Sequence, residues 1–531
     1  MSSLETVVGL WARTAGRIPR GVDRRRLLAP TVFVAANAIA FCLVRPDVPD
    51  LWAARARAAA AADGVGLTYW FSWFGGMTPG EYSVITPFVC ALLGTEVVAA
   101  VSAVAVCSIA TWLVRDTRRP TAATWTVAVS AVINLWCGRV PFLLGAAFAV
   151  ASIVFVRRRR SAPAALLAVL SVLASPVSGA FLGMALSGVL VAPRMRSYRA
   201  AVLVTIASAL GTLILIAILF GTPGPEPFPP YLLAETGIAI VLMLLLAPTP
   251  HMRVTLTVSA VAALVVFLVP NGLGANYVRL ALFCLPAAAV ALSRRRLPTV
   301  AVLMTPILVF GGLTSVSAAR SAAEAASHAS YYEPLAGELD AQPRLADHRL
   351  ELVAAGRAAY ASLVDHAILA RGWETQSFLA LDAQLASGGL DAGEYRAWLD
   401  DNAVGYVAVD TSRVQTPESR LIGAGQLPYL RLIWSHAGWR LYEVLHPTPI
   451  VPRPARLESW SQATMEVHVP CTCRTLVRIR WSRFLTASPS LPDETSDDVE
   501  DAYRPKLTPD PSGWTILRTN RAGTYVLEGL L

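Results

Sequence analysis

Apolar runs separated by short polar breaks fill the first 320 residues of the chain. Such runs predict helices that cross a membrane, although several are shorter than the ~20 residues that a bilayer core requires. We expect about eleven transmembrane helices, at residues 27–44, 88–114, 121–137, 141–156, 162–175, 178–192, 201–220, 231–247, 253–269, 278–292 and 298–315.

Arginines gather at every second break between these runs. Arg24, Arg25 and Arg26 precede the first run, and Arg157–Arg160 follow the fourth. Cytoplasmic loops of membrane proteins carry the excess of Lys and Arg, so the N-terminus is predicted to be cytoplasmic. An odd number of spans then places the chain after Leu313 outside. The predicted localisation is the plasma membrane, crossed many times, with an extracytoplasmic C-terminal region.

The charge of the chain is divided by region. Residues 1–320 hold 26 basic and 10 acidic side chains, a net charge of +16, whereas residues 321–531 hold 19 basic and 26 acidic ones, a net charge of −7. The basic balance therefore comes from loop arginines that face anionic membrane lipids, and it does not indicate a nucleic-acid partner. A content of 55% hydrophobic residues is also higher than that of ordinary soluble proteins.

The pattern changes after Ala319, where alternation of apolar and polar residues predicts strands. The fold class is thus a polytopic α-helical membrane protein with a C-terminal extracytoplasmic region that is α/β and then β-sandwich-like. The expected segments are a cytoplasmic N-terminus (1–26), a transmembrane domain (27–319) with a first external loop (45–86), a linker (320–345), an α/β domain (346–447) and a β-rich domain (448–531).

Local signals place several elements in the external region. Asp391 and Glu394 form a capping-box pattern that opens a helix through Ala403. The insertion 487–512 is rich in Pro, Ser, Asp and Glu and is predicted to be a loop. The predicted strands are 349–353, 404–409, 430–435, 439–444, 463–469, 475–481, 513–519 and 523–529.

The first external loop carries an aromatic cluster that includes Trp70 and Trp73, followed by Gly75 and Gly76. Aromatic residues suit the headgroup zone, so the cluster is predicted to lie at the outer membrane boundary and to cover a cavity. The glycines allow a tight reversal there.

The cysteines carry little chemistry. Cys471 and Cys473 form a C-x-C pair, and on a strand both would point to one face, poorly placed to pair with each other. The cysteine spacing predicts no metal site. No cofactor is certain from the sequence, and a divalent cation stays open.

Acidic residues are the most informative candidates for chemistry. Asp47, Asp50, Asp63 and Glu81 all fall in the first external loop. A general base that works at the membrane surface would need such a place. A solvated loop also carries acids without function, so each acid alone is a weak signal. Asp50 is our first candidate for catalysis, with Asp47 beside it and Glu81 in reserve.

Arg139 and Arg279 are arginines on the face where arginine is otherwise scarce, and each lies at the boundary of a predicted span. A guanidinium group there could hold a lipid phosphate through charge-assisted bonds. The alternative is that each side chain reaches external headgroups without a specific ligand.

Several segments resemble motifs of large actinobacterial polytopic membrane proteins related to the GT-C superfamily of glycosyltransferases. These segments are the first external loop and the stretches CGRVPFLLG, ASPVSGAFLG, GLGANYVRL, LARGWETQ and EYRAWLDDNAVGYVAVD. The resemblance covers most of the chain. It implies a donor sugar carried on polyprenyl phosphate, an essential acid in the first external loop, and transfer at the outer face. GT-C enzymes often pair that acid, whereas this loop offers Asp47 and Asp50, three residues apart.

Two functions of different classes remain. In the first, the protein is a glycosyltransferase that moves a sugar from a polyprenyl-phosphate donor to an envelope glycan or glycolipid, with an external acid as base and Arg139 or Arg279 on the phosphate. In the second, it is a non-catalytic transporter or binding protein for an envelope lipid or glycan. Transporters often show internal repeats and charged residues at mid-span. We find no convincing repeat, and the acids cluster outside the spans, which favours the enzyme.

Overall fold

A computed structural model describes residues 24–531 except 222–223, 247, 387–388, 414–415, 426, 491–504 and 531. The predicted cytoplasmic segment 1–26 therefore lies almost wholly outside the described residues. The chain forms two units, which we call the helical unit (up to Ala54, and Tyr82–Ala323) and the mixed unit (Arg55–Glu81 and Glu324–Leu531). The sequence-based boundaries assigned the whole loop 45–86 to the membrane domain, whereas residues 55–81 belong to the mixed unit.

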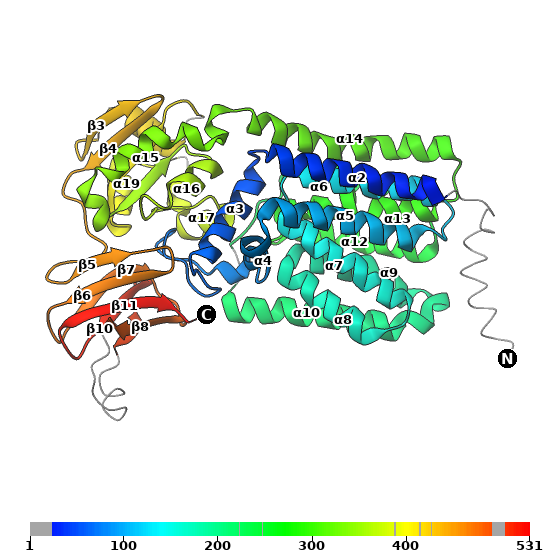
Figure 1. The fold of residues 1–531 in the computed structure, drawn as a ribbon, viewed down its shortest axis with the longest axis horizontal. Coiled ribbons are helices and arrows are strands. Elements are labelled where there is room, and N and C mark those ends of the chain that lie inside the picture. Colours follow the sequence, from blue (N-terminus) through cyan, green and yellow to red (C-terminus); the bar gives the residue numbers. More distant parts are fainter. Residues whose placement is uncertain are drawn as a thin grey trace. The chain divides into compact units, whose positions relative to one another are not determined.

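Each of the eleven predicted apolar runs coincides with one helix of the helical unit or with two consecutive ones (Figure 1). Seven helices in the described chain are long and apolar enough to cross a membrane, and α8, α9 and α11 are shorter apolar helices. The total of about eleven spans stays a prediction. The helices are α2 (Arg24–Val44), α3 (Pro49–Ala62, which begins in the helical unit and ends in the mixed unit), α4 (Thr86–Leu93), α5 (Thr95–Val114), α6 (Pro120–Trp136), α7 (Val140–Arg157), α8 (Ser161–Ala174), α9 (Pro176–Val191), α10 (Arg199–Phe220), α11 (Pro230–Leu245), α12 (Pro250–Leu268), α13 (Leu285–Leu292) and α14 (Leu297–Ala322).

Proline and glycine set the ends of several of these helices. Pro120, Pro176 and Pro230 each begin a helix, where the missing N–H costs no hydrogen bond. The predicted run 88–114 is broken into α4 and α5 at Gly94, whose φ of +88° interrupts the helical backbone.

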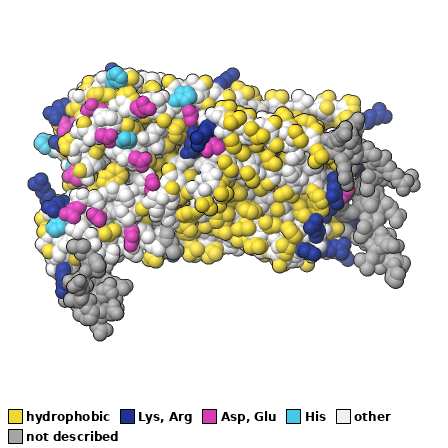
Figure 2. All heavy atoms as spheres, in the orientation of Figure 1, with side chains coloured by type: hydrophobic (Ala, Val, Ile, Leu, Met, Phe, Trp, Pro, Cys, Tyr) yellow, Lys and Arg dark blue, Asp and Glu magenta, His cyan; other side chains and the backbone are white. Residues whose placement is uncertain are grey.

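The surface of the helical unit is apolar, as a membrane protein requires. Leu43 is 79% exposed and Leu92 is 82% exposed, and hydrophobic side chains dominate the visible face of this unit (Figure 2). In its interior, Ala99, Ala103 and Ala128 are fully buried. Small residues let helix backbones approach closely, which is the usual packing of helices within a bilayer.

The mixed unit contains a four-stranded sheet in the order β1-β2-β4-β3. Its strands are β1 (Arg349–Val353), β2 (Val404–Asp410), β3 (Leu430–His436) and β4 (Trp439–Val444). β1 and β2 are parallel and the other pairs are antiparallel, so the predicted α/β character is confirmed. The helices are α15 (Glu333–Asp340), α16 (Arg357–Leu363), α17 (Thr375–Leu381), α18 (Ala383–Ala386), α19 (Ala392–Asp401) and α20 (Pro417–Gly423). The predicted capping box of Asp391 and Glu394 opens α19.

Two antiparallel sheets form the β-rich part, in the orders β5-β6-β11-β8 and β7-β10-β9. Met465 and Val467 of one sheet share a core with Val477 and Leu517 of the other, so the sheets pack face to face. The strands are β5 (Arg456–Trp460), β6 (Thr464–Val469), β7 (Arg474–Arg480), β8 (Leu485–Pro489), β9 (Lys506–Pro509), β10 (Trp514–Arg518) and β11 (Gly523–Gly529). The predicted loop 487–512 thus includes part of β8 and all of β9, and its residues 491–504 lie outside the described residues.

The aromatic cluster of the first loop lies inside the mixed unit. Trp70 is 1% exposed and Trp73 is fully buried. The Trp70 Nε1–H donates to Oε1 of Gln462 at 3.0 Å, and the Trp73 ring meets the Trp373 ring with centroids 4.1 Å apart. The prediction that these side chains lie at a membrane boundary is therefore replaced by a role in the core of this unit. The predicted reversal is confirmed, because Gly75 and Gly76 both have positive φ.

Cys471 and Cys473 form a disulfide, contrary to the expectation that they are poorly placed to pair. That expectation assumed a strand. The two residues lie instead in the turn between β6 and β7, where the backbone directs both sulfur atoms toward each other.

Candidate functional site

Three of the predicted residues meet within the helical unit. Asp50 lies in the first turn of α3, Arg139 directly precedes α7, and Arg279 directly precedes a π-helical turn at Leu280–Cys284. The Oδ2 atom of Asp50 is 3.7 Å from Nε of Arg139 and 3.9 Å from an Nη atom of Arg279. We call these three residues the Asp50 cluster. Folding thus brings one carboxylate beside two guanidinium groups that are 140 residues apart in the sequence.

A glycine lets these elements approach. Gly138 ends the turn after α6 with a φ of +73°, and a Cβ atom there would lie 2.7 Å from the backbone N of Leu51. Only a residue without a side chain allows the α6–α7 turn to pack on the first turn of α3. This contact places Arg139 next to Asp50.

The arginines are held by aromatic and amide side chains. An Nη atom of Arg139 donates to Oδ1 of Asn134 at 3.1 Å, and the Arg139 guanidinium lies over the Phe283 ring at 5.5 Å. The Arg279 guanidinium lies over the Phe142 ring, also at 5.5 Å. Such cation–π contacts fix the planar groups and leave their edges available for an anion.

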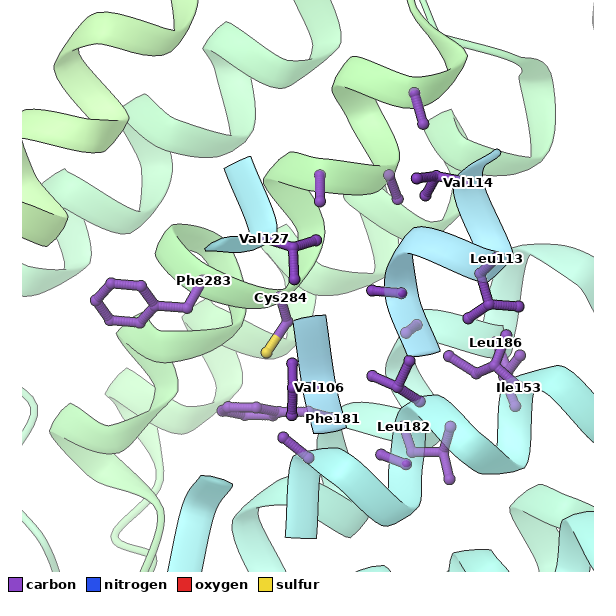
Figure 3. Close-up of a pocket in the computed structure, with 18 of the residues that line it drawn as sticks. Val106, Leu113, Val114, Val127, Ile153, Phe181, Leu182, Leu186, Phe283 and Cys284 are labelled. Atoms are coloured by element: carbon purple, nitrogen blue, oxygen red, sulfur yellow. The ribbon is translucent and has the colours of Figure 1, made fainter. Parts of the chain in front are cut away.

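Residues that contact the two arginines of the Asp50 cluster line a cavity inside the helical unit. The cavity has a volume of about 360 Å³, and its lining includes Asn134, Phe142 and Phe283, the residues that contact the two arginines. The rest of the lining is largely apolar, and Figure 3 shows side chains such as those of Val106 and Leu182 around it. The helical unit thus combines a cationic group with an apolar space beside it.

The charges in the Asp50 cluster favour an additional anion. The side chains of Arg139 and Arg279 are 12% and 18% exposed, and that of Asp50 is 32% exposed. Two guanidinium groups and one carboxylate sum to +1, and reduced solvent access strengthens their field. A phosphate group matches this arrangement, because guanidinium groups bind its oxygens in pairs.

The other two predicted acids lie elsewhere. Asp47 is half-buried in the connection between α2 and α3 of the helical unit. Glu81 belongs to the mixed unit. Within the helical unit, the structure therefore brings together Asp50, Arg139 and Arg279.

Glu81 has an unusual environment within the mixed unit. Burial raises the pKa of its carboxyl group to about 7, against the opposing effect of Arg57 and with a further increase from Glu374. Arg57 and Glu374 form a buried ion pair at 2.8 Å. Glu374 belongs to the LARGWETQ stretch, so part of that stretch supports the folded loop 55–81.

Replacing Glu81 by Gln is expected to reduce the pH dependence of stability. A raised pKa means that the folded unit holds the Glu81 proton more tightly than the unfolded chain does, so stability falls as the pH rises from about 4.5 to about 7. The loss amounts to at most about 3.5 kcal/mol, at ~1.4 kcal/mol per pKa unit. Melting temperatures of the purified protein between pH 5 and pH 8 measure it. An unchanged pH profile in Glu81→Gln would contradict the assignment, and Glu338→Gln is the control.

A metal ion does not fit the Asp50 cluster, because two guanidinium groups already face its carboxylate and oppose a second cation. In the described part of the chain, no group of three or more His, Cys, Asp and Glu side chains is arranged to hold a metal. The divalent cation left open by the sequence therefore has no place at this cluster.

Sequence reasoning did not find the supporting residues. Asn134, Gly138, Phe142 and Phe283 act through contacts between helices, which the sequence does not show. The sequence held one signal for two of these residues: Gly138 and Phe142 both belong to CGRVPFLLG, a stretch on which the resemblance to GT-C proteins rests. No protein-family model matches the chain, and no curated protein sequence matches it. The Asp50 cluster and its cavity are therefore the main guide to function.

Proposed function

We propose that this protein is a membrane glycosyltransferase that moves a sugar from a polyprenyl-phosphate donor to an envelope glycan or glycolipid at the outer face. The observation that carries the proposal is the position of Asp50 beside Arg139 and Arg279, whose contact residues Asn134, Phe142 and Phe283 line a largely apolar cavity. A polyprenyl-phosphate donor has the same two parts, an anionic phosphate and an apolar chain. The resemblance to GT-C proteins adds an expected acid in this loop.

The donor would bind with its phosphate on the two arginines. Both lie 3.7–3.9 Å from Asp50, longer than a direct charge-assisted hydrogen bond. A phosphate can therefore replace the carboxylate as their partner, and Asp50 is then released to face the acceptor. The start of the prenyl chain enters the apolar cavity.

The transfer itself needs one base and one stabilised leaving group. The Asp50 carboxylate takes the proton of the acceptor hydroxyl as its oxygen forms a bond to the anomeric carbon of the sugar. The bond between that carbon and the phosphate oxygen breaks, and the electron pair leaves with polyprenyl phosphate. Arg139 and Arg279 stabilise the charge that develops on this phosphate.

A direct test follows the leaving group. Purified protein in nanodiscs is mixed with a synthetic sugar-charged polyprenyl phosphate and an envelope glycan extract, and released polyprenyl phosphate is measured. Arg139→Ala and Arg279→Ala should each weaken donor use, whereas Arg296→Ala, at an exposed position, should not.

Donor binding without release of polyprenyl phosphate would favour the second candidate, a non-catalytic protein that binds or transports the lipid. The ion pairs of Asp50 with both arginines are compatible with that candidate. Absence of both binding and release would reject a phosphate-headed donor altogether.

The proposal also requires the mixed unit to be outside the cell. The arginine clusters of the helical unit predict this topology. A reporter fused after Gly423 is expected to be active only if it is of the kind that works outside the cytoplasm. A fusion after Arg159, between α7 and α8, should give the opposite result. Cytoplasmic activity after Gly423 would overturn the topology and with it the proposed place of transfer.

A further inference from the structure

A second cavity in the helical unit has five arginines in its lining. It has a volume of about 790 Å³ and is formed by the segments that follow α5, α9 and α13, together with the start of α12. Its charged lining comprises Asp116, Arg118, Arg157, Arg194, Arg196 and Arg294, with His251 beside them. Five guanidinium groups and one carboxylate make this a strongly cationic space.

This second cavity is separate from the Asp50 cluster. Arg139 precedes α7 and Arg157 ends it, so a helix of 18 residues, about 27 Å long at ~1.5 Å per residue, lies between them. The two cationic sites are therefore at opposite ends of the helical unit. Basic side chains gather at one end of the apolar surface in Figure 2.

Three of the lining arginines have no acidic partner among the described residues. Arg157 binds Asp116 at 2.9 Å, but Arg194, Arg196 and Arg294 form no ion pair with any described acidic residue. All three are exposed. A cavity with several such guanidinium groups is suited to a ligand with one or more phosphate groups.

The arginine-lined cavity adjoins the apolar cavity. Thr117, Arg157, Met195 and Leu292 line both. A ligand that fills the pair would have an anionic head among the arginines and an apolar chain beyond Met195. A phospholipid has these two parts, and a free phosphate or nucleotide lacks the second.

We propose that this end of the helical unit binds an anionic phospholipid, with its phosphate held by Arg194, Arg196 and Arg294 and one acyl chain directed into the apolar cavity. Basic pockets between transmembrane helices are known to hold anionic lipid heads on the cytoplasmic side. The arginine distribution assigns this end to the cytoplasm, where such lipids are available. The site does not depend on the transfer chemistry proposed above, although its acyl chain and the prenyl chain of the donor would compete for the same apolar cavity.

Native mass spectrometry of the detergent-purified protein tests the site, with dioleoyl-phosphatidylglycerol as the probe. Changing Arg194, Arg196 and Arg294 together to Gln is expected to weaken binding by ~10- to 100-fold, since each basic residue contributes on the order of 1 kcal/mol to such binding. The matched control changes Arg158, Arg159 and Arg160 to Gln. It removes the same charge, at positions outside both cavity linings. If the two variants lose lipid binding equally, the effect is a general electrostatic attraction between arginines and anionic lipid, and the proposed site is wrong.

Further probes distinguish a phospholipid headgroup from a free phosphate as the ligand. Inorganic phosphate and glycerol phosphate should bind far more weakly than the dioleoyl lipid, and the dihexanoyl lipid should lie between them. Equal binding of inorganic phosphate and the long-chain lipid would overturn the role of the apolar cavity. Equal binding of phosphatidylcholine and phosphatidylglycerol would overturn the requirement for net negative charge. Melting temperatures are measured to check that both arginine variants are folded.

Discussion

Replacing Asp50 by Asn is expected to lower the rate of sugar transfer by ~10²–10⁴-fold, the range for loss of a general base. The amide cannot accept the proton of the acceptor hydroxyl, while its size and its place beside Arg139 and Arg279 are kept. Donor binding should be retained or strengthened, because the variant removes the carboxylate that competes with phosphate for both arginines. The assay is release of polyprenyl phosphate, with donor binding measured separately.

Two comparisons make this result specific. Glu235→Gln, in α11 and outside both cavity linings, should transfer at the normal rate. Asp47→Asn and Glu81→Gln test the other predicted acids. If a variant that combines Asp47→Asn, Asp50→Asn and Glu81→Gln is folded and fully active, acid-assisted transfer at this site is wrong.

Replacing Arg371 by Met should cost the mixed unit ~3–5 kcal/mol of unfolding free energy, as removal of one partner from a buried ion pair does. Arg371 contacts Glu351 and binds Glu418 at 2.9 Å, and the three side chains are 9%, 0% and 2% exposed. The variant leaves two carboxylates buried without their cation. Proteolysis of the full-length protein in increasing urea measures the loss.

The pH dependence of that loss identifies its cause. Burial already raises the pKa of Glu351 to about 8, and removal of Arg371 raises it further. The penalty should therefore be largest at high pH and shrink as the pH falls and the carboxyl groups take up protons. Arg431→Met is the matched control, because the Arg431 side chain is 63% exposed and its partner Glu443 keeps Arg344. A loss in Arg371→Met as small as in this control would contradict the assignment.

The sequence predicted the elements that depend on local pattern. The apolar runs coincide with helices because hydropathy is a property of neighbouring residues, and strands such as β1 and β11 were found at their observed bounds for the same reason. It did not predict β5, β8 or β9, whose alternation is short. It also misplaced Trp70 and Trp73, because an aromatic cluster beside a membrane span fits a lipid surface as well as a protein core.

The candidate site was predicted only in part. The predicted topology placed Asp50, Arg139 and Arg279 on the same, outer side of the membrane and so suggested that they meet. In the structure they do. The contact of Gly138 with Leu51 and the rings under the arginines depend on helix packing, which no single stretch of sequence contains. The catalytic role of Asp50 stays a prediction.

The mixed unit is built from two segments that lie far apart in the sequence, and this affects how the chain folds while the ribosome makes it. Its first piece, residues 55–81, emerges about 240 residues before the second begins at Glu324, yet the Tyr69 hydroxyl donates to the carbonyl of Arg480 and Trp70 to Gln462.

Until the last strands are made, these aromatic side chains lack their permanent partners. Contacts this distant in sequence form late and leave apolar surface open to aggregation. Residues 55–81 therefore need a temporary binding partner for their apolar side chains. The membrane surface or a chaperone on the same side of the membrane can provide it. Chains that stop before Gln462 should be recognised as unfinished and degraded, even though all their apolar helices have been made.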